Sequence, residues 1–243
     1  MRNFDPAKSF GHRVAAHYDD APRGDEAETI DFLERWAHGG PALELAIGTG
    51  RIGLPLSQRG IRLDGIELSE AMVEQLRKKP GGDRIAVTMG DYAEVAVDGT
   101  YKLVFVVFNT FYNLLTQDNQ VRCFENVAKH LTRDGVFIIE AATPNEFFLL
   151  RNGQYVDAEA VEVDRVTLDV ARFDPVTQCL DESHVSITET GITLAPIVTR
   201  YVWPSELDLM ARIAGLRLHA RYGGWFDEPF TADSRRHVSV YGW

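Results

Sequence analysis

Short apolar runs alternate with amphipathic stretches over most of the first 140 residues. Apolar runs that end in a glycine or an acid predict buried parallel strands, and apolar residues at helical spacing predict the helices between them. The strands are expected over residues 42–47, 62–67, 85–89, 102–108 and 136–141, and the helices over 25–38, 51–58, 69–78 and 118–131. This alternation predicts an α/β fold with a doubly wound, mostly parallel sheet.

The pattern changes after Pro144. Between Tyr155 and Trp203 apolar residues recur at alternate positions, which predicts an antiparallel β insertion. A helix over 204–214 and two strands over 216–221 and 237–243 are expected to follow. We therefore predict three parts: an N-terminal arm and helix (1–38), a sheet domain (39–150 and 204–243) and the insertion (151–203).

Composition and charge mainly exclude certain classes of protein and partner. The chain is 45% hydrophobic and 25% charged, as is typical of globular proteins, and no apolar stretch is long enough to span a membrane. A net charge of −11 disfavours nucleic acid and favours a small-molecule partner. No signal peptide is evident, and Cys123 and Cys179 are too few for a disulfide framework or a four-thiolate zinc site. We expect a cytoplasmic protein and no metal.

A glycine-rich turn gives the clearest chemical signal. Gly48-Thr49-Gly50-Arg51-Ile52-Gly53 follows a predicted strand and precedes a helix, and Glu67 ends the next strand 19 residues after Gly48. Glycines let the backbone approach a nucleotide, and a carboxylate accepts hydrogen bonds from both ribose hydroxyls. The motif by itself fits NAD, FAD and S-adenosylmethionine equally.

Three neighbouring features favour S-adenosylmethionine. Glu44, inside the first strand, would reach an ammonium group, which NAD lacks. Gly90–Asp91–Tyr92 closes the third strand with a carboxylate for an adenine amino group. Phe108–Asn109 closes the fourth strand, where aromatic and amide groups would face the reactive end of the ligand.

In combination, these segments resemble the class I, Rossmann-like S-adenosylmethionine-dependent methyltransferases over nearly the whole chain. The matching segments are ALELAIGTGRIG, LDGIELSEAM, VTMGDY, KLVFVVFNTFYNL, GVFIIEAATP and the terminal AGLRL…HVSVYGW hairpin. Ala46 stands where the first motif commonly has glycine, and Ile47 where it often has cysteine. The resemblance implies a seven-stranded sheet with a terminal antiparallel hairpin strand. The insertion is similar to that of small-molecule N-methyltransferases such as the amino-sugar dimethyltransferases, where it forms an acceptor pocket or a subunit contact.

The resemblance also implies a set of cofactor contacts, mostly at the strand ends. Glu67 would bind the ribose hydroxyls, Asp91 the adenine amino group, and Tyr18 would close over the cofactor. Leu68 and Met72 would pack on the adenine. The full set of expected contacts is Tyr18, Glu44, Ala46, Gly48, Gly50, Glu67, Leu68, Met72, Asp91, Tyr92, Phe108 and Asn109.

No general base is evident in the sequence. His17 and Tyr112 are the two candidates, and Asn113 stands near the position where the amino-sugar enzymes often have a histidine. An apolar wall is expected from the aromatic side chains at 108, 111, 112, 203, 225 and 226. We expect methyl transfer to a small molecule, at nitrogen more than at oxygen or carbon, mainly by proximity and orientation.

Two other functions stay open at this point. One is a protein of the same fold that binds the cofactor without transferring methyl, as a cyclase or an assembly partner. The other is an NAD-type oxidoreductase that uses the same glycine turn. The strand edges of the insertion also favour a homodimer.

Overall fold

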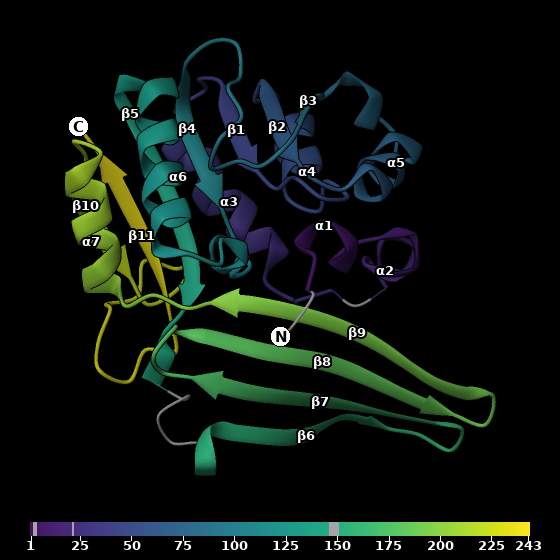
Figure 1. The fold of residues 1–243 in the computed structure, drawn as a ribbon. Helices are drawn as coiled ribbons and strands as arrows, with labels where there is room; N and C mark the ends of the chain where they lie inside the picture. Colours follow the sequence, from purple (N-terminus) through teal and green to yellow (C-terminus); the bar gives the residue numbers. More distant parts are fainter. Residues whose placement is uncertain (2–3, 21, 146–150) are drawn as a thin grey trace.

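The main sheet is mostly parallel. The computed structural model describes residues 1, 4–20, 22–145 and 151–243 (Figure 1). Within this part of the chain, seven strands form one sheet in the order β10-β11-β5-β4-β1-β2-β3. Their bounds are β1 Ala42–Leu45, β2 Leu63–Glu67, β3 Ala86–Met89, β4 Tyr101–Val106, β5 Leu131–Ala142, β10 Arg217–Tyr222 and β11 Arg236–Gly242. Strand β11 runs antiparallel to both of its neighbours, β10 and β5, and the other pairs in the sheet are parallel, so the predicted fold class is confirmed.

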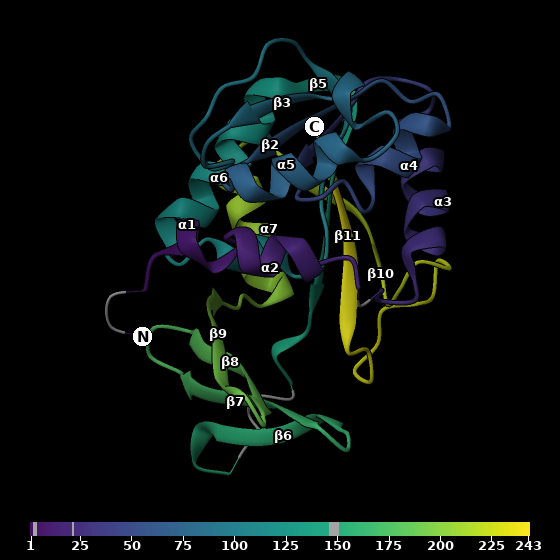
Figure 2. The ribbon, with the colours of Figure 1, turned by 90° about the vertical axis from the view of Figure 1, so that its right-hand side faces the viewer.

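Helices cover both faces of this sheet. On one face lie α3 (Glu26–Ala37), α4 (Gly53–Gln58) and α5 (Glu70–Lys78), and on the other α6 (Gln117–His130) and α7 (Pro204–Ile213) (Figure 2). Strand β4 contributes to both cores because alternate side chains point to opposite faces. Leu103 and Phe105 pack with the first set of helices, and Val104 and Val106 with the second. In the described part of the chain, no helix has the length and apolarity needed to cross a membrane.

Strand ends determine where the site forms. Ser69 begins α5 as predicted, because its hydroxyl accepts a hydrogen bond of 3.2 Å from the backbone N–H of Met72. The prediction for the fourth strand was wrong at its end: β4 stops at Val106, two residues early. Phe108 and Asn109 instead adopt left-handed φ angles of 62° and 60°, which turn the chain away from the sheet.

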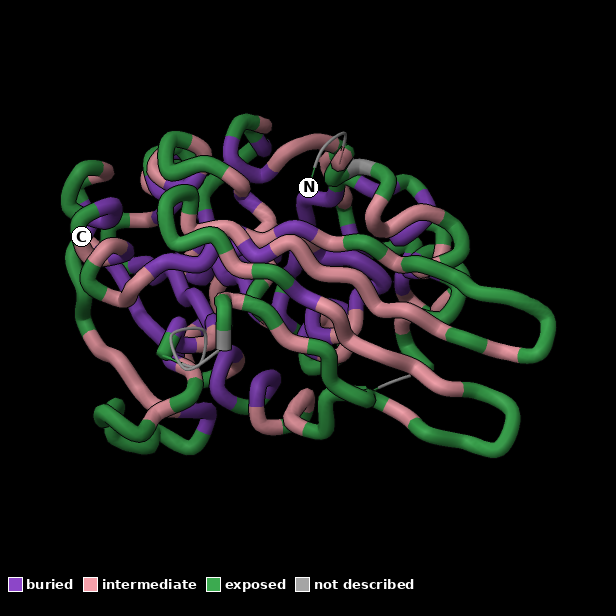
Figure 3. The backbone as a smooth tube through the Cα atoms, turned by 60° about the horizontal axis from the view of Figure 1, so that its bottom comes forward, coloured by how far each residue is buried: buried purple, intermediate pink, exposed green. Residues whose placement is uncertain are grey.

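The insertion is a separate antiparallel sheet. It consists of β6 (Gln154–Val161), β7 (Arg165–Asp174), β8 (Cys179–Thr188) and β9 (Gly191–Arg200), paired in chain order. Its strands extend below the main sheet in Figure 1, and Figure 3 shows that most of their length is exposed or half-buried. The expected boundary at residues 150 and 151 falls at the edge of 146–150, which lies outside the described residues.

A buried ion pair joins the insertion to the main domain. Arg200, at the end of β9, is 5% exposed and donates to Glu206 of α7 at 2.9 Å and to Gln178 at 2.8 Å. Gln120 of α6 donates in turn to the backbone carbonyl of Arg200 at 3.0 Å. The last strand of the insertion is thereby held against two helices of the main domain.

The N-terminal arm lies between the two sheets. Its helices α1 (Pro6–Ser9) and α2 (His12–His17) sit above β9, and α2 packs on α5 (Figures 1 and 2). Ser69 donates to the Phe10 carbonyl at 2.7 Å, and Asp19 pairs with Lys79 at 2.7 Å. These bonds fix the arm over the carboxyl ends of the main strands.

Candidate functional site

A cavity of about 320 Å³ lies at the carboxyl ends of the main strands, the edge where open α/β sheets bind ligands. Three parts of the chain enclose it: the strand ends, the N-terminal arm, and the segment after β4 together with β9. Its walls are formed by Phe4, Asp5, Pro6, Ser9, Phe10, Tyr18, Ala46, Gly48, Glu67, Leu68, Ser69, Met72, Asp91, Tyr92, Thr110, Asn113, Leu114, Leu115, Asn119, Ile197 and Val198.

The glycine turn after β1 brings backbone to the cavity wall. Ala46 and Gly48 line the cavity and both have a φ of 57°, a left-handed conformation that costs Ala46 about 1–2 kcal/mol. Gly50 has a φ of 75°, and a Cβ there would lie 2.5 Å from the Leu76 side chain. It therefore supports the turn from behind and is not among the residues that line the cavity.

Glu67, at the end of β2, links the glycine turn to α5. Its carboxylate accepts hydrogen bonds from the backbone N–H of Gly48 at 2.8 Å, Leu68 at 2.9 Å and Ser69 at 2.8 Å. Burial raises the pKa of the carboxyl, and the backbone donors oppose that shift. A carboxylate has about four acceptor positions, so one is left for a ligand hydroxyl. To accept hydrogen bonds from both ribose hydroxyls, Glu67 must give up one of its three backbone hydrogen bonds.

The end of β3 supplies a second carboxylate. Asp91 is half-buried, lines the cavity and accepts a hydrogen bond of 2.8 Å from the backbone N–H of Ala93. Tyr92 beside it is buried and donates to the Thr110 carbonyl at 2.7 Å, which ties this turn to the segment after β4. Burial raises the pKa of Tyr92 well above its usual range. Glu67 and Asp91 thus flank a space whose apolar lining includes Leu68 and Met72.

Tyr18 covers this space from the arm. Its ring lines the cavity and lies against the Arg51 guanidinium, 4.5 Å from ring centroid to the guanidinium carbon. Arg51 also donates to the backbone carbonyl of Tyr18. Burial raises the pKa of the phenol and the positive charge of Arg51 opposes that shift. The side chain is therefore neutral and closes the cavity as an aromatic wall.

Glu44 occupies a different place from the one expected. It is 4% exposed, is not among the residues that line the cavity, and lies against Gly53 beneath the glycine turn. Burial raises the pKa of Glu44 well above its usual range, which favours the uncharged carboxyl. A Cβ at Gly53 would lie 2.3 Å from Oε2 of Glu44, so the glycine is needed for this packing. Glu44 supports the turn from below and does not face a ligand ammonium group.

The residues expected near the reactive end are not brought to the cavity either. Phe108 and Asn109 lie behind the wall, where Phe108 donates its N–H to Glu140 and the Asn109 amide oxygen accepts from Ala142 at 2.6 Å. The prediction for the aromatic wall was wrong, because none of the side chains at 108, 111, 112, 203, 225 and 226 lines the cavity. Its aromatic lining comes from Phe4, Phe10, Tyr18 and Tyr92, and its aliphatic lining includes Leu114, Leu115, Ile197 and Val198.

Neither candidate base lies in the cavity wall. The His17 side chain is 75% exposed and contacts Asp20 at 2.9 Å. Tyr112 is buried and donates to the carbonyls of Ala142 at 2.6 Å and Val202 at 3.3 Å. Burial raises the pKa of Tyr112, so it has neither the place nor the acidity of a catalytic group.

Sequence reasoning missed the far end of the cavity. The start of the arm, the 3-10 helix η2 (Thr110–Asn113) and β9 meet there. The polar side chains at this end include Asp5 of the arm, Asn113 of η2 and Asn119 of α6. Asn113 had a weak signal, since it lies shortly after the fourth strand, near the position where the amino-sugar enzymes often have a histidine. Phe4 to Phe10 show no periodicity, so only the packing of the arm reveals them.

The cavity wall is acidic. Among the described residues that form it, Asp5, Glu67 and Asp91 carry carboxyl groups and none is a lysine, arginine or histidine. Such a wall favours positively charged ligands and disfavours phosphates.

Comparison with known proteins agrees with this geometry. Residues 42–135 match a family model described as a methyltransferase domain. The cypemycin N-terminal methyltransferase of a Streptomyces species is 29% identical over 209 residues, which cover 83% of this chain and 82% of that protein.

Two solved structures share the whole fold. The CcbJ methyltransferase from Streptomyces caelestis superposes with a TM-score of 0.91 at 34% identity, covering 98% of this chain and 99% of that one. CalS10, an amino pentose methyltransferase from Micromonospora echinaspora solved with S-adenosylmethionine bound, superposes with a TM-score of 0.69 at 20% identity over 99% and 98% of the chains, which shows the shared fold alone. The chain therefore belongs to the class I, Rossmann-like S-adenosylmethionine-dependent methyltransferases.

Proposed function

We propose that this protein transfers a methyl group from S-adenosylmethionine to an amine nitrogen of a small molecule. The main support is the charge of the cavity wall: the described residues that line it include three carboxyl groups and no lysine, arginine or histidine, although one of the three, Asp5, pairs at 3.3 Å with Lys8 outside the wall. An amine reaches the protein largely as an ammonium ion, and this wall attracts it. The similarity to an N-terminal methyltransferase favours the same acceptor atom.

The residues at the strand ends fit the cofactor. Glu67 and Asp91 offer acceptors to the ribose and to the adenine amino group, Leu68 and Met72 offer apolar contacts to the base between them, and Tyr18 covers the ligand. Bound S-adenosylmethionine supplies a methyl group that is already activated by the positive sulfur.

The protein's own contribution is to position and desolvate the acceptor. Leu114, Leu115, Ile197 and Val198 would exclude water around the far end. Asp5, an exposed carboxylate that pairs with Lys8 at 3.3 Å, would attract a cationic group by its charge. Holding two reactants in an aligned geometry contributes about 7–11 kcal/mol to lowering a barrier. Since no histidine lines the described wall, we infer that water takes the amine proton and that proximity provides most of the rate.

Two measurements test this function. Calorimetry should show that S-adenosylhomocysteine binds the folded protein. Labelled S-adenosylmethionine should then transfer methyl to primary or secondary amines in a panel that contains matched phenols. Absence of binding would reject the cofactor, and methylation confined to the phenols would reject the acceptor. The cytoplasmic location and the homodimer stay predictions.

A further inference from the structure

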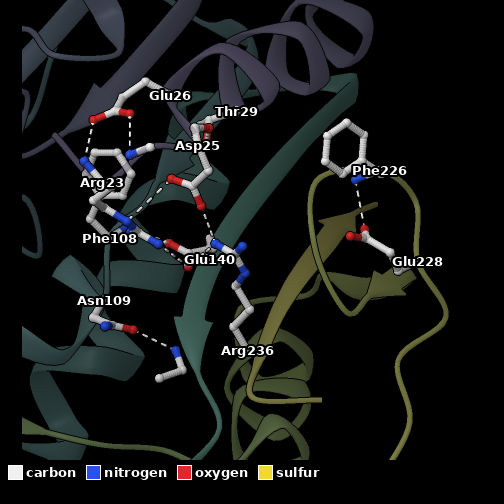
Figure 4. Close-up of polar contacts among 12 residues, drawn as sticks. Arg23, Asp25, Glu26, Thr29, Phe108, Asn109, Glu140, Phe226, Glu228 and Arg236 are labelled. Atoms are coloured by element: carbon white, nitrogen blue, oxygen red, sulfur yellow. Dashed lines mark hydrogen bonds and ion pairs between the residues drawn. The ribbon is translucent and has the colours of Figure 1, made fainter. Parts of the chain in front are cut away.

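Glu140 is a buried acid outside the cavity that the proposed reaction does not use. It lies near the carboxyl end of β5, is 1% exposed and is surrounded by charged partners from distant segments (Figure 4). The Arg23 guanidinium donates to both carboxylate oxygens, at 3.2 and 3.3 Å, and the backbone N–H of Phe108 donates to Oε2 at 2.6 Å. Burying a carboxylate is costly unless it is paired, so these contacts are needed to keep the charge in place.

One of these bonds holds an unusual turn. Phe108 and Asn109 are consecutive non-glycine residues in the left-handed region, which Phe in particular adopts only when its surroundings hold it there. The end of β5 fixes both, because Glu140 accepts from the Phe108 N–H and Ala142 donates to the Asn109 side chain. The chain continues directly into η2, whose Thr110 and Asn113 line the cavity. Glu140 therefore sets the start of the segment that forms one wall.

The hydrogen bonds between Arg23 and Glu140 connect Glu140 to the N-terminal arm. The Arg23 guanidinium also lies 4.1 Å from the centroid of the Phe108 ring, and the Arg51 guanidinium lies 5.9 Å from the same centroid. Arg51 in turn stacks on Tyr18, which covers the cavity. A continuous series of contacts thus runs from Tyr18 through Arg51, Phe108 and Arg23 to Glu140.

We propose that Glu140 is a positioning residue for methyl transfer, which couples the closed arm to the cavity wall after β4. Its bond with Arg23 holds the arm over the cofactor, and its bond with the Phe108 N–H holds the left-handed turn. The inference rests on the proposed function for its link to the cofactor. The two bonds have separable consequences, because one acts on cofactor binding and the other on the acceptor wall.

The substitution Glu140→Gln separates the two roles. The glutamine oxygen, at the position of Oε2, still accepts from the Phe108 N–H and from one Arg23 nitrogen, while its amide nitrogen, a donor, faces the other Arg23 nitrogen. The arm therefore loses one of its two bonds and the ionic attraction, and the turn keeps its bond. We expect the KM for S-adenosylmethionine and the dissociation constant of S-adenosylhomocysteine to rise at least tenfold, with kcat within threefold of the wild type. Arg23→Gln should give the same result. Glu140→Ala, which removes both bonds, should also lower kcat at least tenfold.

A matched control separates positioning from stability. Glu206→Gln neutralises the acid of another buried arginine pair, that with Arg200, and should lower stability without changing the dissociation constant of S-adenosylhomocysteine. Hydrogen exchange of α2 without any ligand provides a readout that does not depend on the reaction. We expect its amides to exchange at least tenfold faster in Glu140→Gln and Arg23→Gln, and at the wild-type rate in Glu206→Gln.

The possible outcomes are distinct. Wild-type exchange and ligand affinity in folded Glu140→Gln would overturn the proposal, as would an equal loss of affinity in Glu206→Gln. If Glu140→Gln does not fold, Arg23→Gln decides by the same two readouts, because the Arg23 side chain is partly exposed at 29%. If the wild type fails to bind S-adenosylhomocysteine, the proposed function fails, and the exchange data still decide whether Glu140 holds the arm.

Discussion

Replacement of Glu67 by glutamine tests the centre of the site with almost no change of shape. The wild-type carboxylate accepts from three backbone N–H groups and has one position left for a ligand hydroxyl. The glutamine oxygen can keep the donors of Leu68 and Ser69, and its amide nitrogen then faces the Gly48 N–H, donor against donor. The variant therefore loses one backbone bond and the negative charge together.

The expected loss of affinity follows from these bonds. A hydrogen bond to a charged group contributes about 1.5–3 kcal/mol and one to a neutral group about 0.5–1.5 kcal/mol. Exchanging a charged acceptor for a neutral one and losing a second ribose contact should cost about 2–3 kcal/mol in binding. This corresponds to a roughly 30- to 150-fold higher dissociation constant for S-adenosylhomocysteine. Stability should fall by about 1–3 kcal/mol, because the Gly48 N–H loses its acceptor.

Isothermal calorimetry measures the affinity and urea unfolding the stability. Glu70→Gln is the matched control: it removes a carboxylate three residues away, from an exposed position in the first turn of α5. It should leave the dissociation constant unchanged. Wild-type affinity for S-adenosylhomocysteine in Glu67→Gln would refute the placement of the ribose. An equal loss of affinity in Glu70→Gln would show that the effect comes from the overall charge of the protein and not from a specific contact.

Three further substitutions test other parts of the molecule. Asp5→Asn should raise the KM for amine acceptors about two- to fivefold in steady-state assays, because an exposed charge pair contributes up to about 1 kcal/mol, and an unchanged KM would contradict its role. Glu206→Gln should lower the free energy of unfolding by about 1–3 kcal/mol in urea, because Arg200 loses a charged acceptor, and unchanged stability would contradict that pairing. A hydrogen bond with Glu182 raises the pKa of His184 to about 9 from an ordinary value of 6.5, so its stabilising effect is full below pH 6.5 and lost as the pH rises through about 9. The difference in stability between the wild type and His184→Gln should therefore shrink over that range, whereas a constant difference would contradict it.

Local sequence signals were sufficient for the buried parts of the sheet domain. Runs of β-branched and aliphatic residues between glycine turns placed most of its parallel strands within two residues, because a strand covered on both faces must be apolar throughout. The end of the fourth strand shows where local sequence signals are insufficient. Phe108 continues its apolar run, and the acceptor that holds Phe108 in a left-handed turn is Glu140, 32 residues later in the chain.

The site was predictable where one strand end defines it. Glu67 is the last residue of β2 and Asp91 lies two residues after β3, so their position at the cavity edge follows from the topology of the sheet. His17 and Tyr112 were predicted as bases from their residue types alone, and a residue type does not fix where the side chain lies. The His17 side chain is exposed, and the Tyr112 hydroxyl donates to two backbone carbonyls. The position of the N-terminal arm at the cavity depends on tertiary contacts, such as the hydrogen bond of Ser69 with Phe10. Such contacts produce no local pattern in the sequence.

The far end of the cavity has two opposite effects on an amine. The carboxylate of Asp5 favours the ammonium form, which binds but has no lone pair to attack the methyl group. The aliphatic side chains of Leu114, Leu115, Ile197 and Val198 disfavour that charge, because desolvation lowers the pKa of an amine. Under the proposed function, the acid would attract the cation to the cavity, and the dry wall would then favour release of its proton to solvent. The reaction would then need no histidine base, and the same arrangement would give no comparable help to a phenol or an alcohol, which must lose its proton beside the Asp5 carboxylate.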